Sequence, residues 1–195
     1  MKDSLILASS SPRRQALLER LGVKFEIVVD HVDETVGAGL SPAETVCVLA
    51  ERKAKSVSMR NPDRLVLAAD TIVVLDDAIL GKPASRSQAL RMLAGLSGRT
   101  HEVLTGVAFL HLESGRKVVD YEVTEVTFSP LTQDEIEVYV SGGSPMDKAG
   151  AYGIQDDRGS LFIRRIAGDY YNVVGLPLNL IYRLARQHFP ELTLF

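Results

Sequence analysis

The chain has 195 residues, of which 46% are hydrophobic and 24% are charged, so it is long enough to bury one substantial core. Its net charge of −3 and its pI near 5.8 provide no overall basic field that would attract nucleic acid or an anionic membrane surface. No apolar run approaches membrane-spanning length and the N-terminal apolar run is too short for a signal peptide, which predicts a soluble, cytoplasmic protein that binds neither nucleic acid nor membrane.

The first stretch, "LILASSSPRR" at residues 5–14, predicts a short buried strand that leads through serines into a helix. Ser11 and the proline after it are a helix-start signal, because a hydroxyl can cap free N–H groups and proline suits the first helical position. Arg13 and Arg14 then fall in the first turn, which already carries partial positive charge. Free N–H groups, hydroxyls such as that of Ser9 and two guanidiniums would suit a phosphate chain. The alternative is that both arginines are solvated or paired with acids of another element.

An acidic loop is predicted over residues 30–39, after an alternating strand at 24–29. Asp33 and Glu34 in this loop could supply a hard oxygen site for Mg²⁺ that bridges phosphates. Acid-rich loops are more often simply solvated, so composition alone leaves both interpretations open.

Residues 41–60 predict a helix, since Ser41 and Glu44 form a capping-box pattern and apolar residues follow at helical spacing. This helix carries Lys53. It also carries Cys47, the only cysteine, which lies in the apolar pattern and is interpreted as a small core residue in preference to a nucleophile.

Asp70 lies inside the apolar run of residues 64–83, which predicts buried strand segments and an Asp-Asp turn before Lys82. An ionised carboxylate in a buried strand costs several kcal/mol unless it is paired, hydrogen-bonded or bound to a metal. Because ligands bind at strand ends in such sheets, we interpret Asp70 as a general base or metal ligand at the carboxyl edge of a strand. The alternative is a structural ion pair with an arginine.

The rest of the chain alternates between predicted helices and strands, with a capping box at Thr132 and Glu135. The fold class expected from this order is α/β with a mixed sheet. The expected elements are a helix at 86–96, a hairpin of strands at 101–112 and 117–128, a short helix after 132, an irregular ligand-proximal segment at 144–155, a strand at 160–166, a turn and short strand at 167–177, and a last helix from about Pro177.

Three lysines, Lys53, Lys82 and Lys148, each lie beside another candidate feature. Any one of them is expected to be exposed to solvent, but three that converge with Arg13 would form a cradle for a polyphosphate. The four histidines show no ligand spacing, which argues against a structural zinc site, and none is placed as the base of a serine hydrolase. Walker, dinucleotide-binding and nucleophile-elbow motifs do not occur.

Five ordered motifs resemble those of the Maf family of nucleoside triphosphate pyrophosphatases: "LILASSSPRRQALLERLG", "AADTIVVLDDAILGKP", "LSGRTHEVLTGV", "PMDKAGAYGIQ" and "GDYYNVVGLP". The resemblance implies a twisted mixed sheet flanked by helices, similar to the inosine triphosphate pyrophosphatase architecture. It also implies a single domain over residues 1–195 with two lobes around a central cleft, and a cytoplasmic homodimer. The implied reaction is metal-dependent hydrolysis of a nucleoside triphosphate to the monophosphate and pyrophosphate, with Mg²⁺ or Mn²⁺ as cofactor.

The resemblance also implies roles for single residues. Asp70 corresponds to the proton acceptor that activates water, and Lys53 and Lys82 correspond to basic catalytic positions. Glu34, together with Asp70, fits the metal-binding position. The implied substrate-binding residues are Ser9, Arg13, Arg14, Thr71, Lys148 and Gln155.

Three of these positions resemble the dTTP/UTP pyrophosphatase branch, which has the same arginine, threonine and glutamine that this chain carries at Arg13, Thr71 and Gln155. The branch that prefers 7-methyl-GTP has tryptophan, glutamine and glutamate instead. A neutral amide can both donate to and accept from a uracil or thymine edge. The alternative function is a non-catalytic nucleotide-binding regulator of septum formation, since the family is associated with cell division.

Overall fold

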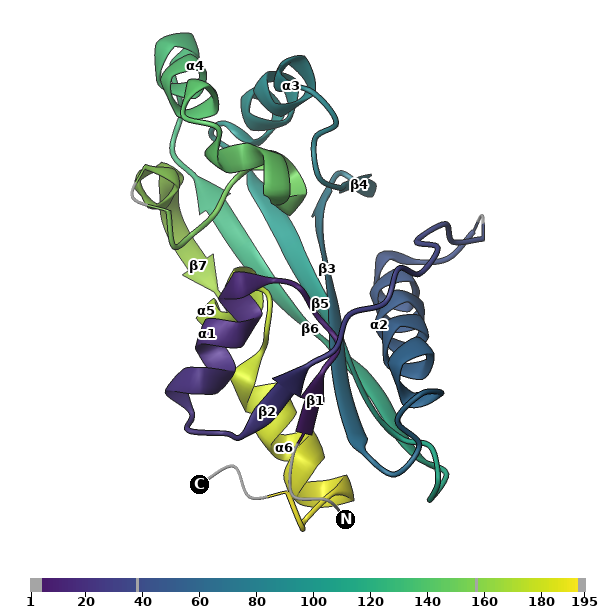
Figure 1. The fold of residues 1–195 in the computed structure, drawn as a ribbon. Helices are drawn as coiled ribbons and strands as arrows, with labels where there is room; N and C mark the ends of the chain where they lie inside the picture. Colours follow the sequence, from purple (N-terminus) through teal and green to yellow (C-terminus); the bar gives the residue numbers. More distant parts are fainter. Residues whose placement is uncertain (1–4, 38, 157, 193–195) are drawn as a thin grey trace. The chain divides into compact units, whose positions relative to one another are not determined.

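A mixed sheet of seven strands forms the frame of the protein (Figure 1). The structure is a computed structural model that describes residues 5–37, 39–156 and 158–192, and the numbers of strands and helices refer to those residues. The strands are β1 (Leu5–Leu7), β2 (Phe25–Ile27), β3 (Leu65–Leu75), β4 (Ala78–Leu80), β5 (Thr100–His111), β6 (Arg116–Phe128) and β7 (Ile163–Ala167). Their order is β2-β1-β3-β5-β6-β7, with β4 paired to β3.

The strand pairs are both parallel and antiparallel, which confirms the predicted mixed sheet. β1 pairs in parallel with β2 and β3, whereas β4 is antiparallel to β3 and β7 is antiparallel to β6. The helices are α1 (Pro12–Arg20), α2 (Pro42–Ser58), α3 (Arg86–Leu96), α4 (Gln133–Ser141), α5 (Tyr170–Val174) and α6 (Leu178–His188), with 3₁₀ turns η1 (Ser144–Asp147), η2 (Ala149–Ala151) and η3 (Gly159–Phe162). None of the helices in the described ranges is long and apolar enough to cross a bilayer.

The chain divides into two compact units, each built from separate stretches of sequence. Unit 1 takes in the described residues of Met1–Asp70, Thr105–Glu122 and Gly175–Phe195. Unit 2 takes in those of Thr71–Leu104 and Val123–Val174. The strands β3, β5 and β6 therefore contribute residues to both units.

In unit 1, α2 covers one face of the sheet because apolar residues at helical spacing on α2 pack against apolar residues at strand spacing on β3. Successive side chains of a strand point to opposite faces, so Val66 and Ala68 of β3 share the face that α2 covers. Ala50, Ala54 and Val57 lie one helical turn apart and pack against them. The helix begins with the predicted capping box of Ser41 and Glu44.

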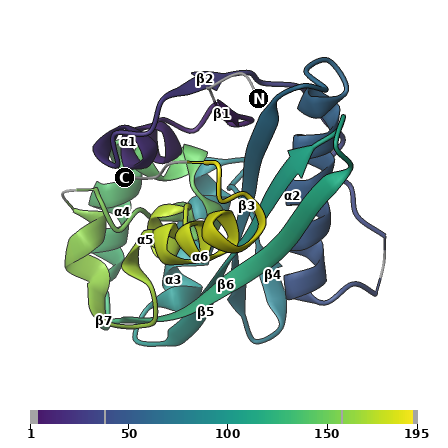
Figure 2. The same ribbon diagram turned by 90° about the horizontal axis from the view of Figure 1, so that it is seen from below.

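The other face of unit 1 packs against α6, and Figure 2 shows α2 and α6 on opposite sides of the strands. Leu180, Ile181 and Leu184 of α6 are buried, and just beyond the helix Phe189 lies against Phe109 of β5 with 5.6 Å between the ring centroids. The alternation of buried side chains along β5 thus supplies both layers of this unit.

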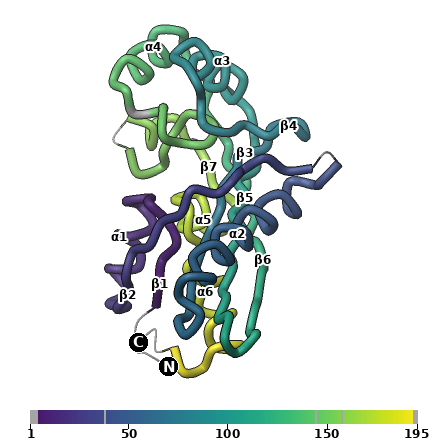
Figure 3. The backbone as a smooth tube through the Cα atoms, turned by 45° about the vertical axis from the view of Figure 1, so that its right-hand side comes forward, coloured from purple at the N-terminus to yellow at the C-terminus, as the bar shows by residue number. Residues whose placement is uncertain are grey.

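Unit 2 has its own core, in which aromatic rings meet between α3, α4 and the strands. Phe128 contacts Tyr152 edge to face at 4.8 Å between centroids, and Phe162 lies 6.1 Å from Phe128. The helices α3 and α4 lie side by side in Figures 1 and 3. The Asp-Asp turn between β3 and β4 forms as predicted, with Asp76 and Asp77 both in the left-handed region.

Two predicted features are wrong. The segment 167–177 was expected to form a turn and short strand, but Tyr170–Val174 is the helix α5. The Asp169 carboxylate accepts the Tyr171 N–H at 2.7 Å, which caps the helix, and the buried Asn172 amide donates to Val103 O at 2.9 Å. These contacts outweigh the strand propensity of tyrosine and valine.

The second error concerns the cap of α1. The helix begins at Pro12 as predicted, with Ser11 at its N-cap, but the Ser11 side chain makes no capping bond. The Ser11 N–H donates instead to Ser9 Oγ at 3.2 Å. Two predicted strands are also shorter than expected, since β2 covers only Phe25–Ile27 and residues 159–162 form η3 before β7 begins.

Candidate active site

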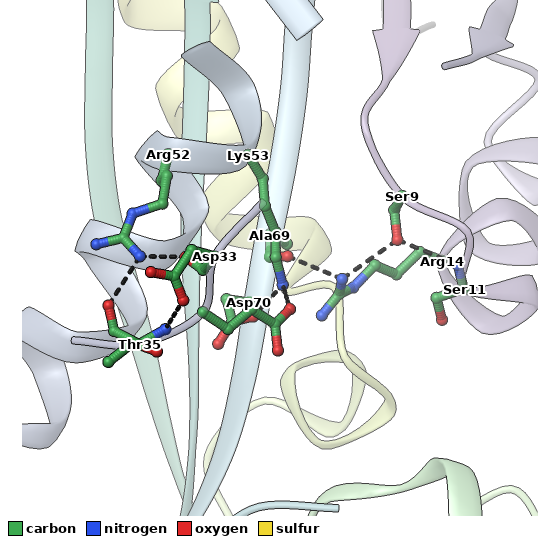
Figure 4. A network of polar contacts seen from close by, with 10 residues as sticks. Ser9, Ser11, Arg14, Asp33, Thr35, Arg52, Lys53, Ala69 and Asp70 are labelled. Atoms are coloured by element: carbon green, nitrogen blue, oxygen red, sulfur yellow. Dashed lines mark hydrogen bonds and ion pairs between the residues drawn. The ribbon is translucent and has the colours of Figure 1, made fainter. Parts of the chain in front are cut away.

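A lysine and an aspartate meet where α2 crosses β3 in unit 1. Asp70 follows Val66 and Ala68 at strand spacing, and Lys53 follows Ala50 at helical spacing, so both side chains lie between the helix and the sheet. Lys53 Nζ donates to Asp70 Oδ1 at 2.5 Å (Figure 4), and the two side chains are 19% and 12% exposed. The buried carboxylate predicted from the sequence is thus compensated by the ammonium group of Lys53.

Glu34 reaches the same ammonium from the loop between β2 and α2. Its Oε1 lies 2.7 Å from Lys53 Nζ, and its side chain is 63% exposed. Two carboxylates therefore share one cation, and the acidic loop is not simply solvated at this residue. No group of three histidine, cysteine, aspartate or glutamate side chains within the described ranges is arranged to hold a metal ion.

Asp70 is not at the end of its own strand, because it is the sixth of the eleven residues of β3. The strand continues because residues 72–74 remain apolar and buried and Val73–Leu75 pair with β4. The nearby strand end belongs to β1, whose last pairing is Leu7 with Leu67. Asp70 thus lies just past the carboxyl end of a parallel neighbour, where that side of the sheet opens.

Arg14 lies beside β3 just beyond the point where β1 ends. Ala8 N–H donates to Leu67 O, and two residues further along β3 the carbonyl of Ala69 points the same way without a strand beside it. Arg14 Nη1 donates to this oxygen at 2.8 Å (Figure 4). Its Nε donates to Gly175 O at 2.8 Å. One guanidinium therefore donates to two backbone carbonyls that lie far apart in the sequence.

Ser9 and Arg13 complete this corner of unit 1. Ser9 is buried, and its Oγ accepts both Ser11 N–H and Arg14 Nη1 at 3.2 Å. Burial lowers the pKa of Arg14 and the charge of Arg13 acts in the same direction, whereas Asp70 and Glu34 oppose them. Arginine stays protonated in proteins, so this corner keeps its positive charge beside the two carboxylates.

In unit 2, Lys148 is buried among acidic groups. It is 9% exposed, and its Nζ lies 2.7 Å from Asp147 Oδ1 and 3.3 Å from Asp156 Oδ2. Tyr139 donates its hydroxyl to the same Asp156 oxygen at 2.9 Å. The predicted solvent exposure of a single lysine is therefore wrong for Lys148.

The loop that holds Gln155 is folded tightly around this lysine. A Cβ on Gly153 would lie 2.8 Å from both the Asp156 carboxyl and Lys148 Cε, so a larger residue would displace them. Gln155 itself is exposed, as is Lys82, and Thr71 is half-buried on β3. The structure thus groups Ser9, Arg13, Arg14, Glu34, Lys53 and Asp70 in unit 1 and Thr71, Lys82, Lys148 and Gln155 in unit 2.

Polar residues that lie beside the predicted ones were missed from the sequence, among them Asp156 and Arg52, which donates to the backbone of the acidic loop. Asp156 lies in the charged "DDRGS" stretch, whose acidic composition was the only available signal, and Arg52 precedes Lys53 on α2 without any motif of its own. Cys47 is half-buried, and burial raises the pKa of its thiol, which disfavours the nucleophilic thiolate.

Solved structures similar to this chain share its fold. A Ham1 protein from Staphylococcus aureus matches with a TM-score of 0.54 and 13% identity, covering 94% of this chain and 98% of that one. A HAM1 protein from Coxiella burnetii matches with a TM-score of 0.52 and 14% identity over the same shares. At this identity the likeness establishes the architecture, a mixed sheet flanked by helices.

Sequence comparison gives the family. The chain matches the family described as Maf-like protein over residues 4–188, and it belongs to that family. A protein named dTTP/UTP pyrophosphatase from Bacillus anthracis (strain CDC 684 / NRRL 3495) is 51% identical over 189 residues, which is 97% of each chain. One of the same name from Salinibacter ruber (strain DSM 13855 / M31) is 51% identical over 188 residues, covering 96% of this chain and 92% of that protein.

Proposed function

We propose that this protein hydrolyses dTTP and UTP to the nucleoside monophosphate and pyrophosphate. The observation that carries the proposal is the group formed by Asp70, Lys53 and Glu34, a buried carboxylate and a second carboxylate on one ammonium group. The names of the relatives that are 51% identical over nearly the whole chain support the same reaction and the same substrates.

Asp70 is the proposed general base. One of its oxygens accepts Lys53, and the carboxylate can take a proton from a water molecule. The water oxygen forms a bond to phosphorus as the bridging P–O bond between the α and β phosphates breaks. The electron pair of that bond leaves with pyrophosphate, and the proton of the water passes to Asp70.

The residues at this site fit a divalent cation. Glu34 and Asp70 present hard carboxylate oxygens close to one another, and Mg²⁺ is commonly held by one or two carboxylates together with waters and phosphate oxygens. We propose that these two residues hold Mg²⁺ or Mn²⁺. When bound there, such a cation would neutralise phosphate charge and polarise a phosphoryl oxygen.

Basic residues are proposed to bind the phosphates. Arg13, Lys53, Lys82 and Lys148 would compensate the charge of the triphosphate and of the leaving pyrophosphate. Ser9 and Arg14 would act mainly by fixing the loop before α1, given the bonds they make to one another and to Ala69.

Recognition of the base is proposed for Thr71 and Gln155. Gln155 is exposed on its loop, and its amide can both donate to and accept from the edge of uracil or thymine. This assignment places the general base in unit 1 and recognition of the nucleobase in unit 2.

The test is pyrophosphate release from dTTP, UTP, CTP, dATP, GTP and 7-methyl-GTP, with Mg²⁺, with Mn²⁺ and with a chelator. We expect release from dTTP and UTP that the chelator abolishes. Nucleotide binding without release from any of the six would contradict the proposal and favour a nucleotide-binding regulator.

The variant that tests the general base is Asp70→Asn, which keeps the size of the side chain and removes the carboxylate that would accept the proton. General-base catalysis contributes about 10²–10⁴-fold, so turnover should fall by that amount. Nucleotide affinity should stay within about tenfold, or ~1.4 kcal/mol. Unchanged turnover in this variant would contradict the role of Asp70.

A further inference from the structure

Glu34 is held in place although its loop has no regular secondary structure. Residues 28–37, the described stretch of loop after β2, form neither helix nor strand. The Glu34 side chain nevertheless reaches Lys53 at 2.7 Å. Adopting this single position costs the loop conformational entropy. Contacts from outside the loop are needed to offset that cost.

The contacts come from Arg52, the residue before Lys53 on α2. Arg52 Nη1 donates to the carbonyl oxygen of Thr35 at 2.9 Å and to that of Asp33 (Figure 4). Within the loop, Asp33 Oδ1 accepts the Thr35 N–H at 2.8 Å. The two carbonyls bonded to Arg52 belong to the residues on either side of Glu34.

We propose that Arg52 is a positioning residue that fixes the Glu34 carboxylate beside Lys53 and Asp70 by binding the backbone on both sides of it. The inference rests on the proposed function, in which Glu34 helps to hold the divalent cation. Arg52 itself acts through the loop backbone and has no assigned contact with the substrate.

A second contact shows why Arg52, and not α2 as a whole, sets the position of Glu34. Arg52 and Ser56 lie four residues apart and therefore share one face of α2, and Arg60 follows in the turn just after the helix. Ser56 Oγ donates to Asp30 Oδ2 at 2.8 Å, and Arg60 pairs with Asp30. These bonds hold the loop four residues before Glu34, whereas the bonds from Arg52 join α2 to the backbone on both sides of the carboxylate.

The experiment compares Arg52→Ala with Lys55→Ala, each of which removes one positive charge from α2. Lys55 is exposed and lies outside the proposed machinery. Substitution of a residue that orients a metal ligand typically lowers metal affinity by about 10–100-fold. Binding of Mn²⁺ is measured by electron paramagnetic resonance without nucleotide. We expect Arg52→Ala to weaken this binding by at least about tenfold and Lys55→Ala to leave it unchanged.

Arg52→Lys and a double-mutant cycle separate positioning from general stability. Lysine keeps a donor for the carbonyls, so it should restore part of the Mn²⁺ affinity without forming the planar fork. If Arg52 acts through Glu34, the variant with both Glu34→Ala and Arg52→Ala binds Mn²⁺ no more weakly than Glu34→Ala alone. Urea unfolding of the same variants shows whether a change in affinity follows a change in stability.

Additive losses in the cycle, or equal Mn²⁺ affinity of Arg52→Ala and Lys55→Ala, would overturn the inference. A loss of Mn²⁺ affinity that Arg52→Lys does not reduce, accompanied by a proportional loss of stability, would overturn it as well. Absence of pyrophosphate release from the unmodified protein contradicts the proposed function, whereas the Mn²⁺ measurements decide the role of Arg52 independently of turnover.

Discussion

At the scale of single residues, a histidine makes the core of unit 2 sensitive to pH. His101 is 2% exposed, and its Nε2 lies 2.8 Å from the hydroxyl of Tyr152. Its Nδ1 has no hydrogen-bond partner among the described residues, and its ring contacts Phe128 edge to face. Burial lowers the pKa of His101 from 6.5 to about 4 and raises the pKa of Tyr152, so both side chains are neutral at pH 7.

The free energy of unfolding should therefore fall as the solution is acidified. Between pH 6.5 and about 4, the unfolded chain binds a proton at His101 that the folded protein does not, so stability is full above pH 6.5 and declines below it. A shift of this size corresponds to at most about 3 kcal/mol. Urea unfolding of the wild type and of His101→Gln at pH 7 and pH 5 measures the effect. An equal loss in both proteins would show that other groups cause it.

At the scale of elements, the close approach of α2 to β5 depends on a glycine. A Cβ on Gly106 would lie 2.3 Å from the carbonyl oxygen of Val46, which is part of the helix backbone. No side chain can move aside there, so the whole helix would have to shift. Lys53 and Arg52 lie on that helix, and their distances to Asp70 and to the acidic loop therefore depend on Gly106.

Gly106→Ala should destabilise the protein and weaken the site together. Overpacking typically costs about 1–3 kcal/mol, and here it displaces backbone rather than a flexible side chain. Gly95→Ala is the matched substitution, because Gly95 lies in α3 and its Cβ would meet only Leu75 Cδ2, at 3.8 Å. It should be stabilising by roughly 0.5–1 kcal/mol, since alanine is the better helix former. Urea unfolding compares the two, and a stability of Gly106→Ala equal to that of the wild type would contradict the close approach.

The elements that could be predicted from the sequence are those with a local signal. The capping boxes at Ser41 and Thr132 form as expected, because each needs only four consecutive residues. Helix α5 was not predicted, because Asn172 makes its hydrogen bond to Val103 O, which is distant in the sequence. The Ser11 side chain was predicted to cap α1, but Ser9 Oγ accepts the Ser11 N–H instead. The role of Arg52 could not be predicted either, because it depends on where a loop without periodicity crosses the helix.

At the scale of the whole molecule, the candidate residues are distributed over two units. The pair of Asp70 and Lys53 belongs to unit 1, whereas Gln155 and Lys148 belong to unit 2. The boundary falls between Asp70 and Thr71 on a single uninterrupted strand. Substitutions at Thr71 and Gln155 should then change which nucleotide is used without removing the general base that activates water.

Gln155→Glu combined with Thr71→Gln tests this division. Glutamate accepts but does not donate hydrogen bonds when ionised, so kcat/KM for UTP and dTTP should fall at least about tenfold, or ~1.4 kcal/mol, relative to that for GTP. Gln133→Glu makes the same chemical change at an exposed position of α4 and should leave the preference unaltered. An unchanged preference in the double variant would show that the base is recognised elsewhere.

The division of unit 1 into three stretches of sequence has a consequence for synthesis of the chain on the ribosome. Its last stretch begins at Gly175 and includes α6, which covers one face of the sheet together with Phe189. A nascent chain whose α6 has not yet emerged from the ribosome exposes the Phe109 side of its strands. Domains generally fold as units during synthesis. Unit 2 ends at Val174, so its whole sequence emerges from the ribosome before unit 1 is complete. The unit that carries Asp70 near its first boundary is thus the last to close.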